Sequence, residues 1–484
     1  MLIYNKNVEN SWKTSLRNKK TDRFCDPFSC GGRWTRTTEL IRGQIYSLLQ
    51  LPLCDSPKIL KNVFLSDLTL QKYDFFSLHR QKFTNNFRNF AALNFFEMKY
   101  DFDKIVNRAD SNCVKYDLRK NVFGNPNVLP MWVADMDFET PDFARDAVKQ
   151  RAEHPVYGYH FKDDAYFQSV IGWLKRRHQW EVQQEWMFFT PGVVCGFMMA
   201  VMALTKEGDE VLIQSPVYPP FHHAAGNHGR KLVYNPLIKG ETGYVMDYEL
   251  LEKQTQTAKL LILCNPHNPV GRCWSRDELT RLGEICMKNG VTVISDEIHC
   301  DLVLPGFKHT PFASINEEFA QHSITFHAAS KTFNLAGLAT STCIVPNPEL
   351  RDLVNGYVHS MEADLGNIFG KVATQAVMTN GDEWLGQLLD YIQGNVDFVS
   401  DFLNNNLPKV KFFKPQATYM MWLDFNGYGL SEEEMWRKMT QEAQLGFNRG
   451  SEFGKEGTNF FRINLACPRA TVEEAMRRLK VTFG

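Results

Sequence analysis

Between about residue 127 and residue 380, short apolar runs alternate with longer segments whose apolar positions recur at helical spacing. The short runs are rich in Val, Ile, Leu and Phe, which favours strands, and polar turns separate them from the helical segments. Strands that alternate with helices predict an α/β fold with a large, mostly parallel sheet and helices on both faces. The predicted strands cover 186–189, 210–214, 231–234, 260–263, 291–295 and 323–326, and the predicted helices include one ending at 204 and one over 277–288.

The order of predicted elements changes after about residue 380. The apolar run 420–424 is a predicted strand, and 471–479 is a predicted helix near the end of the chain. Helix, strand and helix in this order indicate a second, smaller α+β domain. We therefore expect a large domain over 127–380, a C-terminal small domain over 381–484, and an N-terminal segment, 98–126, that joins the small domain.

The first 97 residues differ from the rest in both pattern and charge. They hold 15 Lys and Arg against 8 Asp and Glu, and they lack sustained helical or strand periodicity. Met98 is followed by a segment that resembles a native start. We expect residues 1–97 to be a basic extension that is disordered or spurious, with a DNA-binding or targeting extension as the alternative.

Composition excludes several classes of function for the whole chain. The net charge of −1 over 484 residues argues against bulk binding of nucleic acid or anionic membrane. There is no apolar run of about 18 residues, so no membrane span is expected, and the first residues lack the apolar core of a signal peptide. The 11 cysteines are scattered without a CxxC pair. They indicate reduced thiols in a cytoplasmic protein.

Three polar residues follow three of the predicted strands. Asn268 follows 260–263, Asp296 follows 291–295, and Lys331 follows 323–326. Ligands of open α/β sheets bind outside the carboxyl ends of the strands. A lysine that forms a Schiff base and an acid for the pyridine nitrogen are what pyridoxal 5'-phosphate (PLP) requires of a protein. Each residue alone also has an ordinary interpretation, as a surface lysine, a strand-end cap or a turn residue.

Further candidates would complete a PLP site. Gly192, Val193 and Val194 lie where a strand turns into a helix, so their N–H groups could bind the cofactor phosphate, with the Ser330 hydroxyl as an addition. Tyr218 is either a core residue or a side chain that stacks on the cofactor ring. Arg462 is flanked by apolar residues in a short predicted strand. A bidentate clamp on a substrate carboxylate explains it better than a surface ion pair does.

With these motifs in place, the chain resembles the fold type I, PLP-dependent aminotransferase class I/II family over residues 98–484. Within that family it is similar to the branch of cystathionine β-lyases and cysteine-S-conjugate β-lyases of the MalY/PatB type. The resemblance implies the PLP-dependent transferase (aminotransferase-like) fold. It rests on the phrases Tyr100-Asp101-Phe102-Asp103, Val133-Ala134-Asp135-Met136-Asp137-Phe138, Phe189-Thr190-Pro191-Gly192-Val193-Val194, Cys264-Asn265-Pro266-His267-Asn268-Pro269, Ser295-Asp296-Glu297-Ile298-His299 and Arg462-Ile463-Asn464-Leu465-Ala466-Cys467-Pro468.

The resemblance also implies a role for each candidate. Lys331 would be the PLP lysine, Asp296 would pair with ring atom N1, and Asn268 would pair with O3′. Tyr218 would stack on the ring, and Arg462 would hold the substrate carboxylate.

Members of this family are usually homodimers, and Tyr159 matches a tyrosine that reaches the partner subunit's phosphate. Two positions depart from the common aminotransferase pattern. Ala339 replaces an arginine that pairs with the phosphate, and His299 replaces a tyrosine beside the cofactor. Both departures occur in the lyase branch.

The expected function is therefore β-elimination from cystathionine or a related L-cysteine S-conjugate, which yields a thiol, pyruvate and ammonia. The alternative is an aminotransferase that acts on an L-amino acid and a 2-oxo acid, because the same residues serve both reactions. A third possibility is a regulator that uses such a domain as a sensor. Regulators of this kind carry an N-terminal winged helix, and residues 1–97 show no capped helix-turn-helix pattern. We expect a small amino-acid substrate and no nucleic-acid or membrane partner.

Overall fold

The computed structural model describes residues 99–484. The expectations for residues 1–97 therefore lie outside the described residues. No helix within 99–484 is both long enough and apolar enough to cross a membrane.

A seven-stranded sheet forms the centre of the larger part of the fold, in the order β2-β10-β9-β8-β7-β3-β4. Strands β3, β4, β7, β8 and β9 are parallel to their neighbours in this group, whereas β10 is antiparallel to both β2 and β9. The strands are β2 Met187–Thr190, β3 Glu210–Ile213, β4 Lys231–Tyr234, β7 Ala258–Cys264, β8 Thr292–Asp296, β9 Ser323–His327 and β10 Ser341–Ile344.

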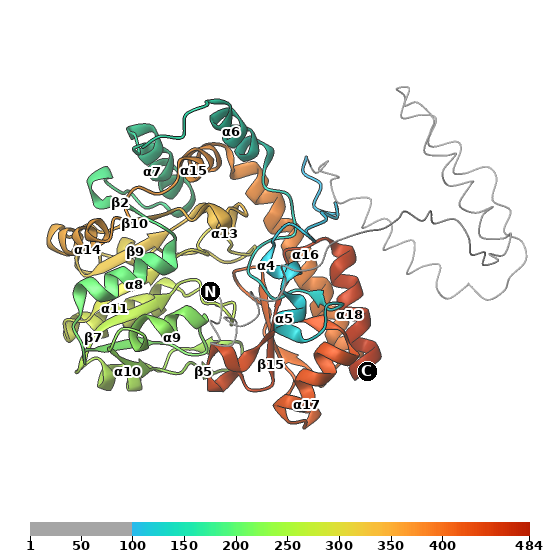
Figure 1. Ribbon diagram of the computed structural model, residues 1–484. Coiled ribbons are helices and arrows are strands. Elements are labelled where there is room, and N and C mark those ends of the chain that lie inside the picture. Colours follow the sequence, from blue (N-terminus) through green and yellow to red (C-terminus); the bar gives the residue numbers. More distant parts are fainter. Residues whose placement is uncertain (1–98) are drawn as a thin grey trace, which may run out of the picture. The chain divides into compact units, whose positions relative to one another are not determined.

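Side chains alternate between the two faces of this sheet, and both faces are covered by helices (Figure 1). On β7, Leu260 and Ile262 pack in one apolar cluster with α8 and α9, whereas Leu261 and Leu263 pack in another with α10 and α11. A strand buried on both faces reads as a continuous apolar run, which is why the sequence predicts it. The covering helices are α8 Val193–Leu204, α9 Pro219–Gly226, α14 Pro348–Ser360, α10 Tyr248–Gln254, α11 Arg276–Lys288 and α12 Glu317–Gln321.

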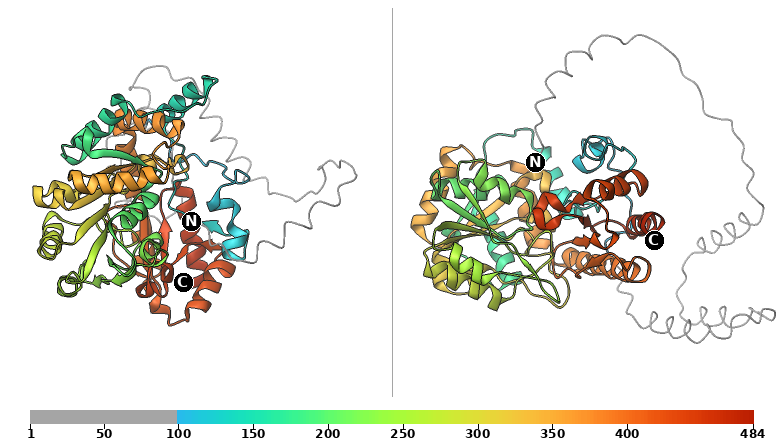
Figure 2. Two further views of the ribbon diagram at one scale, coloured as in Figure 1. Left: turned by 60° about the vertical axis from the view of Figure 1, so that its left-hand side comes forward. Right: turned by 90° about the horizontal axis from the view of Figure 1, so that it is seen from below.

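A four-stranded antiparallel sheet, β11-β12-β15-β14, lies in the C-terminal part of the chain. Both views of Figure 2 show these orange and red elements as a layer beside the green and yellow sheet. Two long helices, α16 and α18, pack against each other here. The elements are β11 Lys411–Phe412, β12 Met420–Asp424, β13 Leu445–Gly446, β14 Asn448–Arg449, β15 Phe460–Asn464, α16 Asp382–Asn406, α17 Glu432–Arg437 and α18 Arg469–Phe483.

The N-terminal described segment joins this C-terminal part through backbone pairing. β1 (Leu129–Pro130) runs parallel to β13, and the Phe123 ring packs on the Trp436 ring at a centroid distance of 5.6 Å. The joining segment expected over 98–126 and the predicted boundaries at 127 and 381 stay predictions. The remaining elements are α4 Val114–Asp117, α5 Arg119–Phe123, α6 Asp142–Glu153, α7 Asp164–His178, α13 Ala329–Thr332, α15 Ile368–Asn380, β5 Ile238–Lys239 and β6 Tyr244–Val245.

The predicted α/β fold is confirmed, and most predicted strands shift by only one or two residues. The strands at 231–234 and 420–424 have the predicted bounds. The antiparallel strand β10 was not predicted, since the run Ser341-Thr342-Cys343-Ile344 is half polar and gives a weak strand signal.

Candidate active site

The three central candidates lie after the carboxyl ends of three neighbouring strands. Asp296 is the last residue of β8, Asn268 lies four residues beyond the end of β7, and Lys331 lies on α13, directly after β9. Because β7, β8 and β9 are parallel neighbours, their carboxyl ends meet at one edge of the sheet. The strand order therefore brings together an amide, an acid and an amine that are up to 63 residues apart in the chain.

Asp296 is a buried acid with little hydrogen bonding. Its side chain accepts one hydrogen bond, from the Ile298 N–H at 3.1 Å, and the residue is 5% exposed. Burial raises the pKa of Asp296 to about 7, since removal from water penalises the charged form. A cation placed against this carboxyl group would reverse that shift, so the site favours a positively charged partner.

Lys331 is a partly buried amine with a nearby carbonyl. Its Nζ atom donates to the Ala134 carbonyl at 2.6 Å. Removal of water from the amine lowers the pKa of Lys331 to about 8, while the fields of Asp135 and Asp296 raise it and that of Arg462 lowers it further. Near neutral pH a measurable fraction of such an amine is unprotonated and can act as a nucleophile or base.

Arg462, on β15, is a buried guanidinium with neutral partners. Its Nη1 donates to the Asn268 side-chain oxygen at 3.0 Å, and its Nη2 donates to the Trp132 carbonyl and to the Asn448 side-chain oxygen at 2.8 and 2.7 Å. The group lies 4.8 Å from the Phe453 ring centroid. Burial lowers the pKa of Arg462 to about 10, so the group stays cationic at neutral pH. It can accept a carboxylate in a bidentate pair.

Three aromatic residues surround these groups. Tyr218 precedes the first residue of α9, and its charge interactions reach both Arg462 and Asp296. Tyr419 donates from its hydroxyl to the Ala134 carbonyl at 2.9 Å, and its ring centroid lies 6.1 Å from that of His299. Burial holds the pKa of His299 well below its ordinary value, so its ring is neutral at pH 7.

A segment that we call the strap, residues 131–138, connects the two cations of the site. Its Trp132 carbonyl accepts from Arg462, and its Ala134 carbonyl accepts from Lys331. The strap is held on the other side by Asn464, whose side-chain amide donates to the Val133 and Asp135 carbonyls at 2.7 and 2.6 Å.

Buried and partly buried ion pairs fix the far end of the strap. Arg108 pairs with Asp135 and Asp137 at 2.6 Å each, and Lys115, which is 1% exposed, pairs with Asp137 at 2.9 Å. Asn334 adds hydrogen bonds to the Met136 N–H and carbonyl. The strap therefore has a fixed course past Lys331.

No hydrogen bond or ion pair joins the other predicted residues to this cluster in the described part of the chain. Gly192 precedes the first residue of α8 with φ +93°, and an added Cβ there would meet no atom within 4 Å, so the start of α8 offers N–H groups and space. Tyr159 is 96% exposed. The phosphate roles predicted for Gly192, Val193, Val194, Ser330 and Tyr159 stay predictions.

The residues present fit PLP. Asp296 needs a cationic partner, and Lys331 is an amine of lowered pKa beside it. Two buried polar atoms, His299 Nδ1 and Arg462 Nε, have no hydrogen-bond partner among residues 99–484. Polar atoms left unpartnered in a protein interior are costly, and they mark places where a polar ligand gains free energy by binding. The donor set therefore suits a cationic ring nitrogen, a ring oxygen and a carboxylate.

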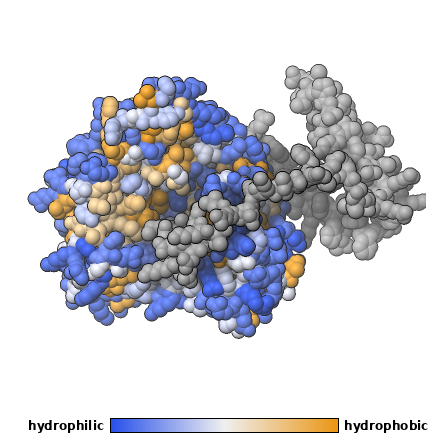
Figure 3. Space-filling model, viewed as in Figure 1, coloured by the Kyte–Doolittle hydropathy of each residue, from blue (hydrophilic) through white to orange (hydrophobic). Residues whose placement is uncertain are grey.

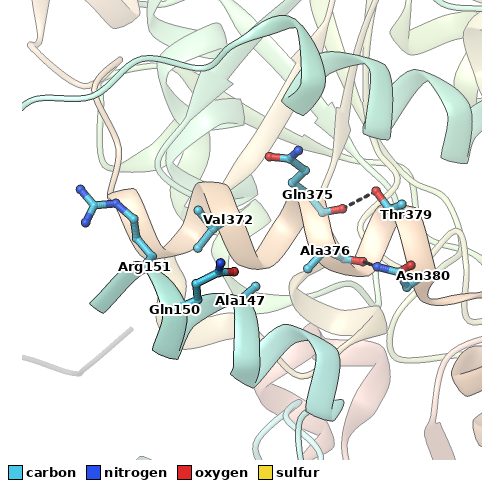
Figure 4. A pocket seen from close by; sticks show the side chains of 8 residues that line it. All are labelled: Ala147, Gln150, Arg151, Val372, Gln375, Ala376, Thr379 and Asn380. Carbon is cyan, nitrogen blue, oxygen red and sulfur yellow. Dashed lines mark hydrogen bonds between the residues drawn. The ribbon is translucent and has the colours of Figure 1, made fainter. Parts of the chain in front are cut away.

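A separate groove of about 470 Å³ lies between α6 and α15, lined by Ala147 and Gln150 on one side and by Val372 and Thr379 on the other (Figure 4). Some of its polar groups already have hydrogen-bond partners within α15, where the Thr379 hydroxyl donates to the Gln375 carbonyl at 2.7 Å. None of its lining residues belongs to the Lys331 cluster, so we do not assign it to the active site.

Asp135, Tyr419 and Asn448 contribute to the site and were not predicted. Asp135 appeared only within a family phrase, and Tyr419 lies next to an ordinary strand. Tyr419 meets the Ala134 carbonyl across 285 residues of sequence, a separation at which no local pattern gives a signal.

Comparisons with known proteins identify the family of the chain. The family described as aminotransferase class I and II matches residues 126–479. Cystathionine β-lyase PatB of Bacillus subtilis (strain 168) is 43% identical over 386 residues, which is 79% of this chain and 100% of PatB.

Solved structures give the same result. Cystalysin from Treponema denticola, which contains PLP, has a TM-score of 0.77 at 36% identity, over 80% of this chain and 99% of cystalysin. The PLP-bound C–S lyase from Staphylococcus hominis has a TM-score of 0.75 at 33% identity, with the same coverage. The match with the family covers most of the chain, and PatB is matched over its full length. The chain therefore belongs to the aminotransferase class I and II family.

Proposed function

We propose that this protein is a PLP-dependent carbon–sulfur β-lyase that cleaves cystathionine or a related L-cysteine S-conjugate to a thiol, pyruvate and ammonia. The observation that carries the proposal is the cluster of Lys331, Asp296 and Arg462 at the carboxyl edge of the sheet. Among the relatives, PatB is named for cystathionine β-lyase activity and the Staphylococcus hominis protein for C–S lyase activity.

In this proposal each residue of the cluster contacts one part of PLP or substrate. Lys331 would attach the cofactor, Asp296 would pair with the ring nitrogen and Asn268 with the ring oxygen, while Tyr218 and His299 would pack on the ring. PLP supplies an acceptor for the electron pair that remains when a substrate loses its Cα proton. The N–H groups of Gly192, Val193 and Val194 and the Ser330 hydroxyl would bind the phosphate.

The residues of the chain then move one proton and hold one anion. Lys331 Nζ takes the Cα proton, for which its lowered pKa of about 8 suits it near neutral pH. Arg462 binds the substrate carboxylate, and its hydrogen bond to the Asn268 side chain keeps the guanidinium in one orientation. A substrate held at both points presents its Cα–H bond to the lysine.

The choice between lyase and aminotransferase depends on what happens after proton removal. A thiolate on Cβ is a good leaving group, so elimination competes well with return of a proton. Ala339 occupies the position where many aminotransferases carry a phosphate-binding arginine, and it ends a short 3-10 helix in an exposed left-handed turn. The aminotransferase alternative receives less support from the relatives, several of which are named for cystathionine β-lyase activity.

The proposed assembly is a homodimer in which Tyr159 reaches the partner subunit's phosphate. The segment before α7 exposes large apolar side chains, with Val156 at 61%, Tyr157 at 60% and Phe161 at 76%. Most of the face seen in Figure 3 is hydrophilic, and apolar residues gather in a few patches. An exposed aromatic loop of this kind suits burial against a second copy. The eight free cysteines of the described residues are compatible with the expected cytoplasmic location, which stays a prediction.

The test is an assay of the purified full-length chain with cystathionine and no added 2-oxo acid. We expect pyruvate and a free thiol in equal amounts, and no pyruvate from L-alanine, which lacks a leaving group on Cβ. If product forms only when a 2-oxo acid is supplied, and no S-conjugate releases a thiol, the aminotransferase alternative replaces this proposal.

A further inference from the structure

Behind the Lys331 cluster lies a second buried carboxyl group, Asp301, whose side chain has no exposed surface. Its Oδ1 atom accepts from His178 Nε2 at 2.7 Å and from Trp173 Nε1 at 2.9 Å. Its Oδ2 atom accepts from the Thr332 hydroxyl at 2.9 Å, and His327 Nε2 lies 3.8 Å away. We call these five residues the Asp301 hub.

The hub is a hydrogen-bonded core and not a metal centre. The ligand atoms of His178, Cys300, Asp301 and His327 lie within 4.8 Å of one another, a spacing that could suit a cation. However, the indole N–H of Trp173 and the Thr332 hydroxyl already donate to the carboxylate oxygens. A cation would have to displace these donors, and all four residues are buried, so no metal is proposed.

The hub connects α7, β9, the loop after β8 and α13. His178 and Trp173 belong to α7, and His327 ends β9. Asp301 lies five residues after Asp296, and Thr332 directly follows Lys331. One hydrogen bond, from the Thr332 hydroxyl to Asp301, therefore connects the residue after the amine with the loop that begins at the acid.

A second histidine–carboxylate pair supports the hub from the side. Glu297, the neighbour of Asp296, accepts from the Ser295 hydroxyl at 2.8 Å and bonds His309 Nε2 at 2.9 Å. The His309 ring packs edge to face on the His178 ring, with centroids 5.3 Å apart. Both carboxylates are thus held by histidines that contact each other, which leaves the loop after β8 little freedom to move.

We propose that Asp301 is a positioning residue, which fixes the α13 turn through Thr332 and so holds the Lys331 amine at its distance from Asp296. The consequence for catalysis rests on the proposed function, but the effect on the amine itself does not. Three charged groups face this amine: Asp135 from the strap, Asp296 from β8 and Arg462 from β15. If the turn loosens, the amine leaves this enclosed position and gains water, and its pKa rises toward 10.5.

The experiment compares Thr332→Val with Thr325→Val in the full-length chain. Both replace a buried threonine with an isostere, but the Thr325 hydroxyl on β9 has no hydrogen-bond partner among the described residues, whereas that of Thr332 binds Asp301. In the cofactor-free protein, labelling of Lys331 by an amine reagent is followed across pH by peptide mass spectrometry. We expect the midpoint to rise by about one pH unit in Thr332→Val and to stay unchanged in Thr325→Val.

The loaded enzyme provides a second measurement. We expect kcat of Thr332→Val to fall about tenfold, because misplacement of a reacting group by a fraction of an ångström has effects of this size, while KM stays within about twofold. If Thr332→Val does not fold, the same labelling experiment compares Thr332→Ser with Thr332→Ala. Both lose the methyl group, and only Thr332→Ala, which loses the hydroxyl as well, should shift the labelling midpoint.

The two proposals fail in different ways. If Thr332→Val and Thr325→Val show the same labelling midpoint, or Thr332→Ala matches Thr332→Ser, the positioning role is wrong whatever the reaction. If the midpoint shifts as expected but the unsubstituted enzyme releases no thiol from any S-conjugate, the positioning role stands and the proposed reaction is wrong.

Discussion

Two buried carboxyl groups five residues apart, Asp296 and Asp301, have pKa values displaced in opposite directions. Burial raises the pKa of Asp296 to about 7, against a single backbone hydrogen bond. Burial also opposes ionisation of Asp301, but the hydrogen bond from His178 and the nearby His327 ring hold its pKa well below the ordinary value. The burial of the two groups is similar, so the number of donors decides the charge.

The region around Asp296 is therefore suited to binding a ligand, whereas the region around Asp301 is suited to holding neighbouring elements in place. Around Asp301 the donors are supplied by the protein, so the charge is stable and the surrounding elements are fixed. Around Asp296 the protein supplies a single hydrogen-bond donor, which leaves a carboxyl group that binds a cationic ligand strongly. Substitutions around Asp301 should therefore lower stability as well as displace Lys331, whereas substitutions around Asp296 should act mainly on binding and turnover.

The largest effect is expected from Lys331→Ala, which changes only the region around Asp296. Lys331→Ala should lower the rate of pyruvate release by about 10³-fold, because general-base catalysis contributes on this scale. Borohydride should no longer attach the cofactor to the chain, while the free energy of unfolding changes little. Lys259→Ala removes an exposed lysine from β7 and serves as the control. Borohydride attachment at any other lysine would contradict the assignment of Lys331.

The next prediction compares the contributions of the two carboxyl groups to the free energy of unfolding of the cofactor-free chain. Asp301→Asn should lower the free energy of unfolding at pH 7 by about 3 kcal/mol, since it removes the charged partner of a buried hydrogen-bonded group. Asp296→Asn should raise it, by at most about 4 kcal/mol at pH 8, because an amide carries no charge to desolvate. Urea denaturation at several pH values measures both.

The pH dependence of these two variants should have opposite signs. A lowered pKa stabilises the native state above the unfolded value near 3.8, and that stability is lost as pH falls through the folded pKa, so the cost of Asp301→Asn should shrink below about pH 4. A raised pKa penalises the native state increasingly between 3.8 and about 7, so the gain from Asp296→Asn should appear across that window. If the free energies of unfolding of the two variants changed with pH in the same way, the proposed difference between Asp296 and Asp301 would be wrong.

A smaller effect is expected from Arg462→Lys, which keeps the charge and loses the planar fork. The ammonium cannot bind a carboxylate in a bidentate pair while also bonding Asn268, so KM for cystathionine should rise about 30-fold with a lesser change in kcat. Arg449→Lys, on the neighbouring strand β14, is the control, because its guanidinium stacks on the Trp436 ring outside the cluster. Equal effects of the two substitutions on KM would argue against a carboxylate clamp at Arg462.

The smallest effect should come from removal of residues 1–97. PatB is matched over its whole length by 386 residues of this chain, and the family match begins at residue 126. A chain that begins at Met98 should therefore retain kcat and cofactor content within about twofold. Insoluble or inactive protein from this shorter chain would show that the extension belongs to the folded enzyme.

The sequence predicts the parts of this fold that local patterns encode. Buried parallel strands are continuous apolar runs, so their ends, and the residues Asn268, Asp296 and Lys331 that follow them, can be located without a structure. The antiparallel strand β10 has no such pattern, since its side chains Ser341 and Thr342 are polar but satisfied by neighbours, as in the 2.7 Å hydrogen bond between Ser341 and Thr190.

The contacts between the candidates could not be predicted in the same way. Arg462 and Asn268 were expected to bind different parts of the substrate and cofactor, and their direct hydrogen bond spans 194 residues of sequence. The Ala134 carbonyl, which accepts from both Lys331 and Tyr419, is a backbone atom that any residue type supplies. The hub around Asp301 depends on buried histidines whose partners are set by the packing of α7 on the sheet.

The strap also determines what a ligand must offer to this site. In the interior, Arg462 already has three neutral oxygen acceptors, the Trp132 carbonyl and the side chains of Asn268 and Asn448. A ligand that brings an ester or a primary amide to the guanidinium exchanges one neutral acceptor for another and gains little free energy. A carboxylate brings a full negative charge and two oxygens, so it can displace the neutral acceptors from the guanidinium. The protein's own carbonyl and amide oxygens thus compete with the ligand for Arg462, so that amino acids are distinguished from their uncharged derivatives without any steric barrier.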